Sequence, residues 1–395
     1  MTQDEPSRPA PEAGQRRVAA AVRDPKGAAP PRTADEAGPG SFPSVAGPVL
    51  SQADLDPVLR DAVRACLAGL PAQAPAAVAV SGGADSSMLA VYAAHVAREQ
   101  GRELHLLHVH HGLQADADEW AERVQALAGL LGAPLASLCV AVDTGDGTGV
   151  EAAARTARYA ALSAQARGIG AAAVLLAHHR HDQAETVLLR LLRGAGPSGM
   201  AAMAAETWHE GARYLRPWLD IGRGAVLAAA QRWADRTGWH PVADPTNQDP
   251  RYTRAAVRTM LAPVLDVRWP GWRDILARHA RQATEAAGIL DEVARADFAR
   301  LEPAPDDRSF ALAPWRELAA PHQTLVLRHW FARNGVRMPT EARLAELARQ
   351  LRQLHALGHD RQMLFEHGPV RVRCVRGRVL LEPRPAGRGR APRAR

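Results

Sequence analysis

The chain has 395 residues, 47% of them hydrophobic and 23% charged, which is enough to bury a large core and to form more than one folded unit. Its net charge of +7 favours a polyanionic partner, and its three cysteines form no CxxC pair, which excludes a disulfide framework and a cysteine-based zinc site. Lys26 is the only lysine, so the phosphate-binding lysine of a Walker loop is excluded in the folded part. Without a long apolar run or a secretory signal, we expect a cytoplasmic protein with no membrane partner.

Residues 1–49 are rich in Pro, Ala and Gly without periodicity, and we expect a disordered extension there. From residue 50 to 244, short apolar runs alternate with helical patterns, which predicts an α/β domain with a doubly wound, mostly parallel sheet. The predicted strands are Ala76–Val80, Leu104–Val109, Leu135–Val142 and Ala172–Ala177, and the helices are Ser86–Gln100, Asp118–Leu131 and Val150–Arg167.

After Asp244 the pattern changes. Residues 245–357 have helical periodicity and predict a second, helical domain, and residues 358–382 predict a small β region with a hairpin around Gly377. Residues 383–395 form an arginine-rich tail, for which RNA contact and a solvated tail without function are equally good interpretations.

The turn after the first strand reads Ser81-Gly82-Gly83-Ala84-Asp85-Ser86-Ser87 and leads into a helix. Glycines allow close backbone approach, and the helix N-terminus and serine hydroxyls suit an anion, so the turn predicts a phosphate site. The acidic side chain of Asp85 beside bound phosphates is explained if it holds a Mg²⁺ ion. The alternative is an ordinary capped glycine-rich turn, but the full string after a buried strand is more specific.

This string matches SGGxDS, the signature of the PP-loop ATP pyrophosphatases, and implies an adenine nucleotide alpha hydrolase-like sheet that cleaves ATP between its α and β phosphates. Further segments resemble the tRNA(Ile)-lysidine synthetases within that superfamily. They are His108–Leu113, Glu151–Tyr159, His179–Thr186 with its continuation Leu192–Met200, and Asp244–Arg258.

The resemblance implies roles for individual residues. ATP is held by Ser81, Gly82, Gly83, Ala84, Asp85, Ser86, His110, Gly112 and His179. Catalysis falls to Asp85, Asp182, Glu185 and Arg193, with Mg²⁺ on Asp85 and Asp182, and the tRNA is contacted by Arg155, Arg158, Asn247, Arg254 and Arg258. For the arginines the alternative is a salt-bridged helix face, and Arg254 and Arg258 are expected to meet either tRNA phosphate or the acidic motif.

The chain departs from the family pattern at two positions. His181 stands where the family usually has the first of two aspartates, and Ala255 replaces an asparagine. Because Mg²⁺ prefers oxygen ligands, metal binding then depends on Asp85 and Asp182.

The implied reaction adenylates the wobble cytidine of a CAU-anticodon tRNA(Ile) and joins L-lysine to C2, giving lysidine, AMP and pyrophosphate. One rival is a tRNA 2-thiolation enzyme, which the lack of cysteines in the motifs disfavours. The other is a catalytically inactive RNA-binding protein, an alternative that the two departures, His181 and Ala255, keep open. The sequence leaves the oligomeric state and the lysine pocket open.

Overall fold

The computed structural model describes residues 54–110, 117–140, 150–354 and 363–385. The expected disordered extension, Gly112 and the tail from residue 386 onward lie outside the described residues. Among the residues described, no helix combines the length and the hydropathy needed to cross a membrane.

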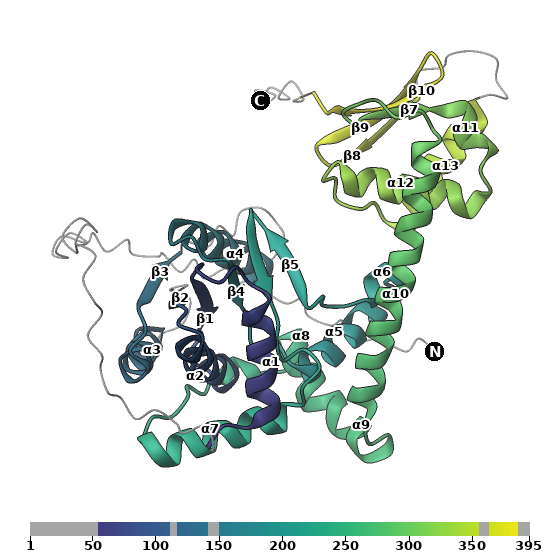
Figure 1. Cartoon of the computed structure of the whole chain (residues 1–395). Helices are drawn as coiled ribbons and strands as arrows, with labels where there is room; N and C mark the ends of the chain where they lie inside the picture. Colours follow the sequence, from purple (N-terminus) through teal and green to yellow (C-terminus); the bar gives the residue numbers. More distant parts are fainter. Residues whose placement is uncertain (1–53, 111–116, 141–149, 355–362, 386–395) are drawn as a thin grey trace, which may run out of the picture. The chain divides into compact units, whose positions relative to one another are not determined.

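The first part of the chain forms a six-stranded sheet in the order β3-β2-β1-β4-β6-β5 (Figure 1). All neighbouring strands are parallel except β5 and β6, so the mostly parallel α/β sheet predicted from the sequence is confirmed. The strands are β1 (Ala76–Ala79), β2 (Leu104–His110), β3 (Leu135–Cys139), β4 (Ala173–Leu175), β5 (Glu206–His209) and β6 (Ala212–Leu215).

Alternation along the strands places a separate core on each face of this sheet. Val78 of β1 packs with the helices of one face, whereas its neighbour Ala77 packs with Tyr159 and Leu162 of the other. The helices of the first face are α1 (Pro57–Ala68), α2 (Ala84–Glu99), α3 (Ala117–Leu131) and α7 (Arg223–Thr237), and α4 (Val150–Gly168) covers the second. The sheet is therefore doubly wound, as predicted.

The hairpin of β5 and β6 was absent from the prediction, which placed no strand between Ala177 and Asp244. Its turn consists of Glu210 and Gly211, both with positive φ (46° and 78°), as short hairpin turns require. The exposed, polar residues of β5 lack a buried alternation, which explains why the pattern was missed.

Two elements link the sheet to the helical region. Helix α5 (Arg180–Leu192) follows β4, and α6 (Pro197–Met200) comes next. Ala184 of α5 packs against Ala262 and Trp272, which belong to α9 (Ala262–Arg268) and to the long α10 (Trp272–Ala299). This packing brings the segment after Asp244 against α5.

A wider helical turn precedes α9. Two short turns, η2 (Pro245–Gln248) and α8 (Thr253–Ala256), lead into a π-helical turn, η3 (Val257–Leu261). Pro263 explains the widening, because it cannot donate a hydrogen bond to the Thr259 carbonyl and its ring pushes that carbonyl away. The turn carries Arg258.

The C-terminal region has its own core, built on Phe310, Trp315, Trp330 and Phe331. The predicted hairpin is confirmed by β9 (Val370–Val375) paired with β10 (Arg378–Pro383), but it is part of a four-stranded antiparallel sheet with β7 (Ser309–Ala311) and β8 (Leu364–His367). The three residues of β7 are too few for a visible alternation. The helices here are α11 (Leu312–Glu317), α12 (Ala320–Arg333) and α13 (Glu341–Gln353).

Candidate active site

The predicted phosphate-binding turn leaves β1 and enters α2 directly. Gly82 has a φ of +91°, and a Cβ there would lie 3.2 Å from a methyl group of Val242, so both the backbone and the space demand glycine. The Ser86 hydroxyl accepts a hydrogen bond from the Ser81 N–H at 3.0 Å and ties the turn to the helix. Gly83, the N-cap of α2, offers no side-chain cap, so the first N–H groups of α2 stay available to an anion.

A cavity of about 400 Å³ opens beside this turn, at the C-terminal ends of β1, β2 and β4. Strand β1 lies between β2 on one side and β4 on the other, so the order in which strands are added reverses at β1. Such a switch point is where α/β sheets bind ligands. The polar residues of its wall are Ser81, Asp85, Ser86, His108, His110, Arg158, His178 and Asp244, and the larger apolar ones are Leu107, Val109, Trp120, Tyr159, Leu162 and Leu176. We call it the nucleotide cavity.

Asp85 lies in the first turn of α2 and is held by groups from two other elements. Arg223, at the start of α7, donates hydrogen bonds to its two carboxylate oxygens at 3.2 and 3.1 Å, and the Nε2 atom of His179 lies 3.5 Å from Oδ1. Burial alone raises the pKa of Asp85, but the hydrogen bond and charge of His179, followed by those of Arg223, outweigh it and lower the pKa to about 2. Asp85 is therefore an anion at neutral pH.

His179 lies between two carboxylates at the N-cap of α5. It forms a capping box with Asp182, in which Nδ1 accepts from the Asp182 N–H at 3.3 Å and the Asp182 carboxylate accepts from the His179 N–H at 3.1 Å. Since Nδ1 is an acceptor, the ring proton belongs on Nε2, which faces Asp85. His179 thus connects the phosphate-binding turn to the acidic residues of α5.

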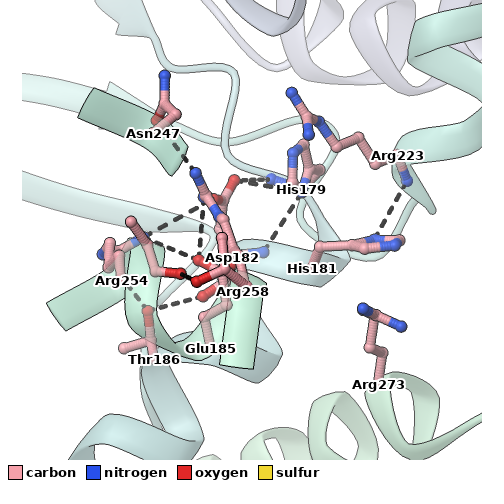
Figure 2. A network of polar contacts seen from close by, with 12 residues as sticks. His179, His181, Asp182, Glu185, Thr186, Arg223, Asn247, Arg254, Arg258 and Arg273 are labelled. Atoms are coloured by element: carbon pink, nitrogen blue, oxygen red, sulfur yellow. Dashed lines mark hydrogen bonds and ion pairs between the residues drawn. The ribbon is translucent and has the colours of Figure 1, made fainter. Parts of the chain in front are cut away.

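Asp182 and Glu185 are buried on one face of α5, where Arg258 meets them both (Figure 2). Arg258 binds Glu185 through two hydrogen bonds, at 2.7 and 3.0 Å, and reaches Asp182 at 3.2 Å. It also donates to the side-chain oxygen of Asn247 at 3.2 Å. Arg254 lies 3.7 Å from Asp182 and 3.8 Å from Glu185. Of the two partners expected for Arg254 and Arg258, the structure pairs both arginines with the acidic motif.

Comparison with known proteins identifies the family. Residues 59–265 match the model of a PP-loop domain, and residues 310–380 match that of a TilS substrate binding domain. The tRNA(Ile)-lysidine synthase of Bordetella bronchiseptica is 60% identical over 341 residues, which cover 86% of this chain and 99% of that protein. The chain belongs to the tRNA(Ile)-lysidine synthase family. The resemblance seen in the motifs is confirmed, and the chain is a PP-loop enzyme that uses ATP.

This lysidine synthase family member also matches more distant relatives. The tRNA(Ile)-lysidine synthase of Ralstonia nicotianae is 44% identical over 308 residues, covering 78% of this chain and 64% of that protein. Among solved structures, the U34-tRNA thiolase of Methanococcus maripaludis is 15% identical with a TM-score of 0.47, over 57% of this chain and 78% of that one.

The two departures from the lysidine synthetase pattern have different surroundings. The Nδ1 atom of His181 accepts a hydrogen bond from the Arg223 backbone N–H at 3.4 Å, and its ring meets that of His179 edge to face. Burial, followed by the charge of Arg273 and its neighbours, lowers the pKa of His181 to about 4, so the ring is neutral at pH 7. Ala255 is buried in α8, and nothing in the structure explains its replacement of asparagine.

The residues fit a Mg²⁺ ion that arrives with nucleotide phosphates, but not an ion held by protein alone. Within the described ranges, no three His, Cys, Asp or Glu side chains converge as a metal site would require. Asp182 and Asp85 are both paired with arginines, but of the two only Asp85 lines the nucleotide cavity, where phosphates would meet it. One carboxylate beside a phosphate-binding turn is the usual protein share of a Mg²⁺–nucleotide site.

His178, which the sequence did not single out, lines the cavity with Arg158 and is bound by a second such residue, Arg216. Arg216, after β6, is buried and donates to Nδ1 of His178 at 3.2 Å. Burial lowers the pKa of His178 to about 3, and the charges of neighbouring arginines lower it as well, whereas the charge of Asp182 acts in the opposite direction. Arg158 contacts the Tyr159 ring at 5.7 Å and has no carboxylate partner among the described residues. Strand β6 was not predicted, so the place of Arg216 directly after it was not predicted either. Arg223 lies 138 residues from Asp85, and no local pattern in the sequence marks it.

The remaining predicted residues are spread more widely. Arg193 is exposed at the C-terminal end of α5, about 16 Å along the helix from Asp182, so the structure does not bring it to the phosphate-binding turn. His110 lines the nucleotide cavity and lies 3.1 Å from a carboxylate oxygen of the exposed Asp118. Arg155 lies over the Tyr159 ring at 5.0 Å.

Proposed function

We propose that the chain forms lysidine in tRNA(Ile), by joining L-lysine to C2 of the wobble cytidine of a CAU anticodon at the expense of ATP. The observation that carries this proposal is the uncapped N-terminus of α2, which opens on the nucleotide cavity at the switch point of the sheet. Membership of the lysidine synthase family supports the same substrate.

In the first step the cytidine O2 attacks the α phosphate of ATP, pyrophosphate leaves, and the base carries AMP at C2. In the second step the lysine ε-amine attacks C2, AMP leaves, and the amine loses its proton. Neither step requires a protein nucleophile, so the protein contributes orientation and charge. The first N–H groups of α2 and the Ser81 and Ser86 hydroxyls bind the phosphates. The neighbouring Ser87 has a buried hydroxyl without a hydrogen-bond partner among the described residues.

Arg158 is placed to neutralise charge during both steps, because it lines the nucleotide cavity without a carboxylate partner among the described residues. The network of Asp182, Glu185 and Arg258 fixes α5 against η3. Asp85 would hold Mg²⁺ together with the phosphates, and the ion would neutralise charge on the departing pyrophosphate.

The cysteines argue against the thiolation alternative. No disulfide joins Cys66, Cys139 and Cys374, all of which are described residues, and none of the three lines the nucleotide cavity. Burial raises the pKa of Cys66 to about 11, so its thiol stays protonated and unreactive. Cysteines without a disulfide also support our proposal that the protein acts in the reducing cytoplasm.

The test measures release of labelled pyrophosphate from ATP by the full chain with Mg²⁺, lysine and CAU-anticodon tRNA(Ile), each omitted in turn, and analyses the nucleosides of the recovered tRNA by mass. We expect tRNA-dependent release and lysidine in the product. Binding of tRNA without any pyrophosphate release would refute the proposal in favour of an inactive RNA-binding protein.

A further inference from the structure

The pair formed by Asp85 and Arg223 places a protein cation against the carboxylate that lines the nucleotide cavity. Arg223 donates to both carboxylate oxygens of Asp85, at 3.2 and 3.1 Å. Mg²⁺ binds through the same oxygens and carries the same sign of charge as the guanidinium. Direct contact between Asp85 and a metal ion therefore competes with this pairing.

Contacts from α5 fix the backbone of Arg223, which is the first residue of α7. Its N–H donates to Nδ1 of His181 at 3.4 Å, and the Arg180 guanidinium donates to the carbonyl of Asp220 just before the helix, at 2.9 Å. Figure 2 shows the Arg223 side chain beside His181. The backbone is thus held in place, and only the long side chain has to turn for the pair to open.

An arginine at the start of a helix is unfavourable unless an anion accompanies it. Gly222, the N-cap of α7, provides no side-chain cap, so the first N–H groups of α7 and the guanidinium of Arg223 both present positive charge. Within the part of the chain that the structure describes, Asp85 is the only carboxylate paired with Arg223. The position of Arg223 is therefore explained by Asp85.

The pairing is open enough to be exchanged. The Arg223 side chain is 39% exposed, and all its bonds to acid go to one carboxylate, which is itself 26% exposed. Arg258 instead binds Glu185 and Asp182, which are only 7% and 12% exposed. Release of Arg258 would leave buried charges, whereas release of Arg223 leaves a carboxylate at the cavity wall, where phosphates bring a cation of their own.

A nucleotide that enters without a metal ion would meet the charge of Asp85. This carboxylate is an anion at neutral pH and stands in the first turn of α2, next to the N–H groups that suit phosphates. Like charges in a partly enclosed site repel each other by more than they do in water. A cation on Asp85 removes this repulsion before any ion has bound.

We propose that Arg223 takes the place of the metal ion at Asp85 while the site is empty. It neutralises the carboxylate, so that phosphates can enter the cavity, and it yields Asp85 when the nucleotide brings Mg²⁺. The inference rests on the proposed function, because it takes Asp85 as the carboxylate that faces the ion.

The test measures the Kd of ATP for the full chain by calorimetry, once with EDTA and once with excess Mg²⁺, without tRNA or lysine. Arg223→Ala leaves Asp85 without its counter-ion only when the metal is absent. We therefore expect the Kd in EDTA to rise about 10-fold, and the Kd with Mg²⁺ to change far less. In Asp85→Asn/Arg223→Ala the repelling charge is gone, so binding in EDTA should return close to that of the wild type.

Two further variants separate charge from structure. Arg236→Ala is the matched control, because Arg236 lies in the last turn of the same helix and holds Asp54 through two hydrogen bonds, at 2.6 and 2.7 Å. It should change neither Kd. Arg223→Lys keeps the positive charge and should retain most of the metal-free binding, which a purely structural role of the guanidinium fork would not allow.

Two results would overturn the inference. One is an Arg223→Ala protein that binds ATP in EDTA as tightly as the wild type does. The other is a loss of binding that is equally large with Mg²⁺ and persists in Asp85→Asn/Arg223→Ala, since Arg223 would then be an ordinary phosphate ligand. Neither result touches the proposed function, which fails instead if the wild type binds ATP but forms no lysidine.

Discussion

Replacing Arg258 by alanine tests the network that joins α5 to the segment after the sheet. Its guanidinium makes two hydrogen bonds to Glu185 and one to Asp182, and the carboxylate side chains are only 7% and 12% exposed. Burial opposes the charge on Arg258, but the hydrogen bond and charge of Glu185, with the charge of Asp182, raise its pKa above the ordinary value. The substitution leaves two buried carboxylates without their main partner.

The size of the effect follows from burial and from what remains nearby. Removing one partner of a buried ion pair costs about 3–5 kcal/mol. Arg254 remains within 3.7 Å of Asp182 and 3.8 Å of Glu185 and compensates in part. We therefore expect Arg258→Ala to lower the free energy of unfolding by about 3 kcal/mol, at the lower end of that range.

The assay is urea unfolding followed by tryptophan fluorescence, with Arg251→Ala as the matched control. Arg251 pairs with Asp249 at 2.6 Å but is 87% exposed, so its removal should change the free energy of unfolding far less than removal of Arg258 does. The double variant Glu185→Ala/Arg258→Ala should be less destabilised than the sum of its single variants, by about 2 kcal/mol. If Arg258→Ala destabilises no more than Arg251→Ala, the network does not stabilise the fold and the reasoning fails.

Three further changes probe the site. Because the pKa of Asp85 is lowered in the folded state, its carboxylate contributes stability above about pH 4 that is lost as the pH falls toward 2. Asp85→Asn should therefore make the free energy of unfolding depend less on pH between these values. An unchanged pH profile would contradict the pairing of Asp85 with His179 and Arg223. Gly82→Ala should lower unfolding free energy by about 1–3 kcal/mol and abolish pyrophosphate release, whereas Gly101→Ala, with positive φ but open space, should keep the activity. Single replacements of Cys66 and Cys139 by alanine should preserve lysidine formation in the nucleoside assay, and loss of product in either would implicate a thiol.

The amino-acid sequence by itself determined the parts of the protein that depend on neighbouring residues. A continuous apolar run such as Ala76–Val80 is a property of consecutive residues, and the alternation of such runs with helical patterns predicted a doubly wound sheet. The turn from Ser81 to Ser87 likewise places its glycines and serines at a helix start through local backbone geometry alone. The family motifs were readable for the same reason.

Only the tertiary structure decided which charged groups meet. Arg223 reaches Asp85 across 138 residues and Arg258 reaches Glu185 across 73, because the packing of α7 and α9 sets these contacts and no local pattern encodes them. Arg258 lies in the π-helical turn before Pro263, and the length of α5 places Arg193 about 16 Å along the helix from Asp182. The sequence supplies the charged groups, but the distance between them on the folded chain decides what they can bind.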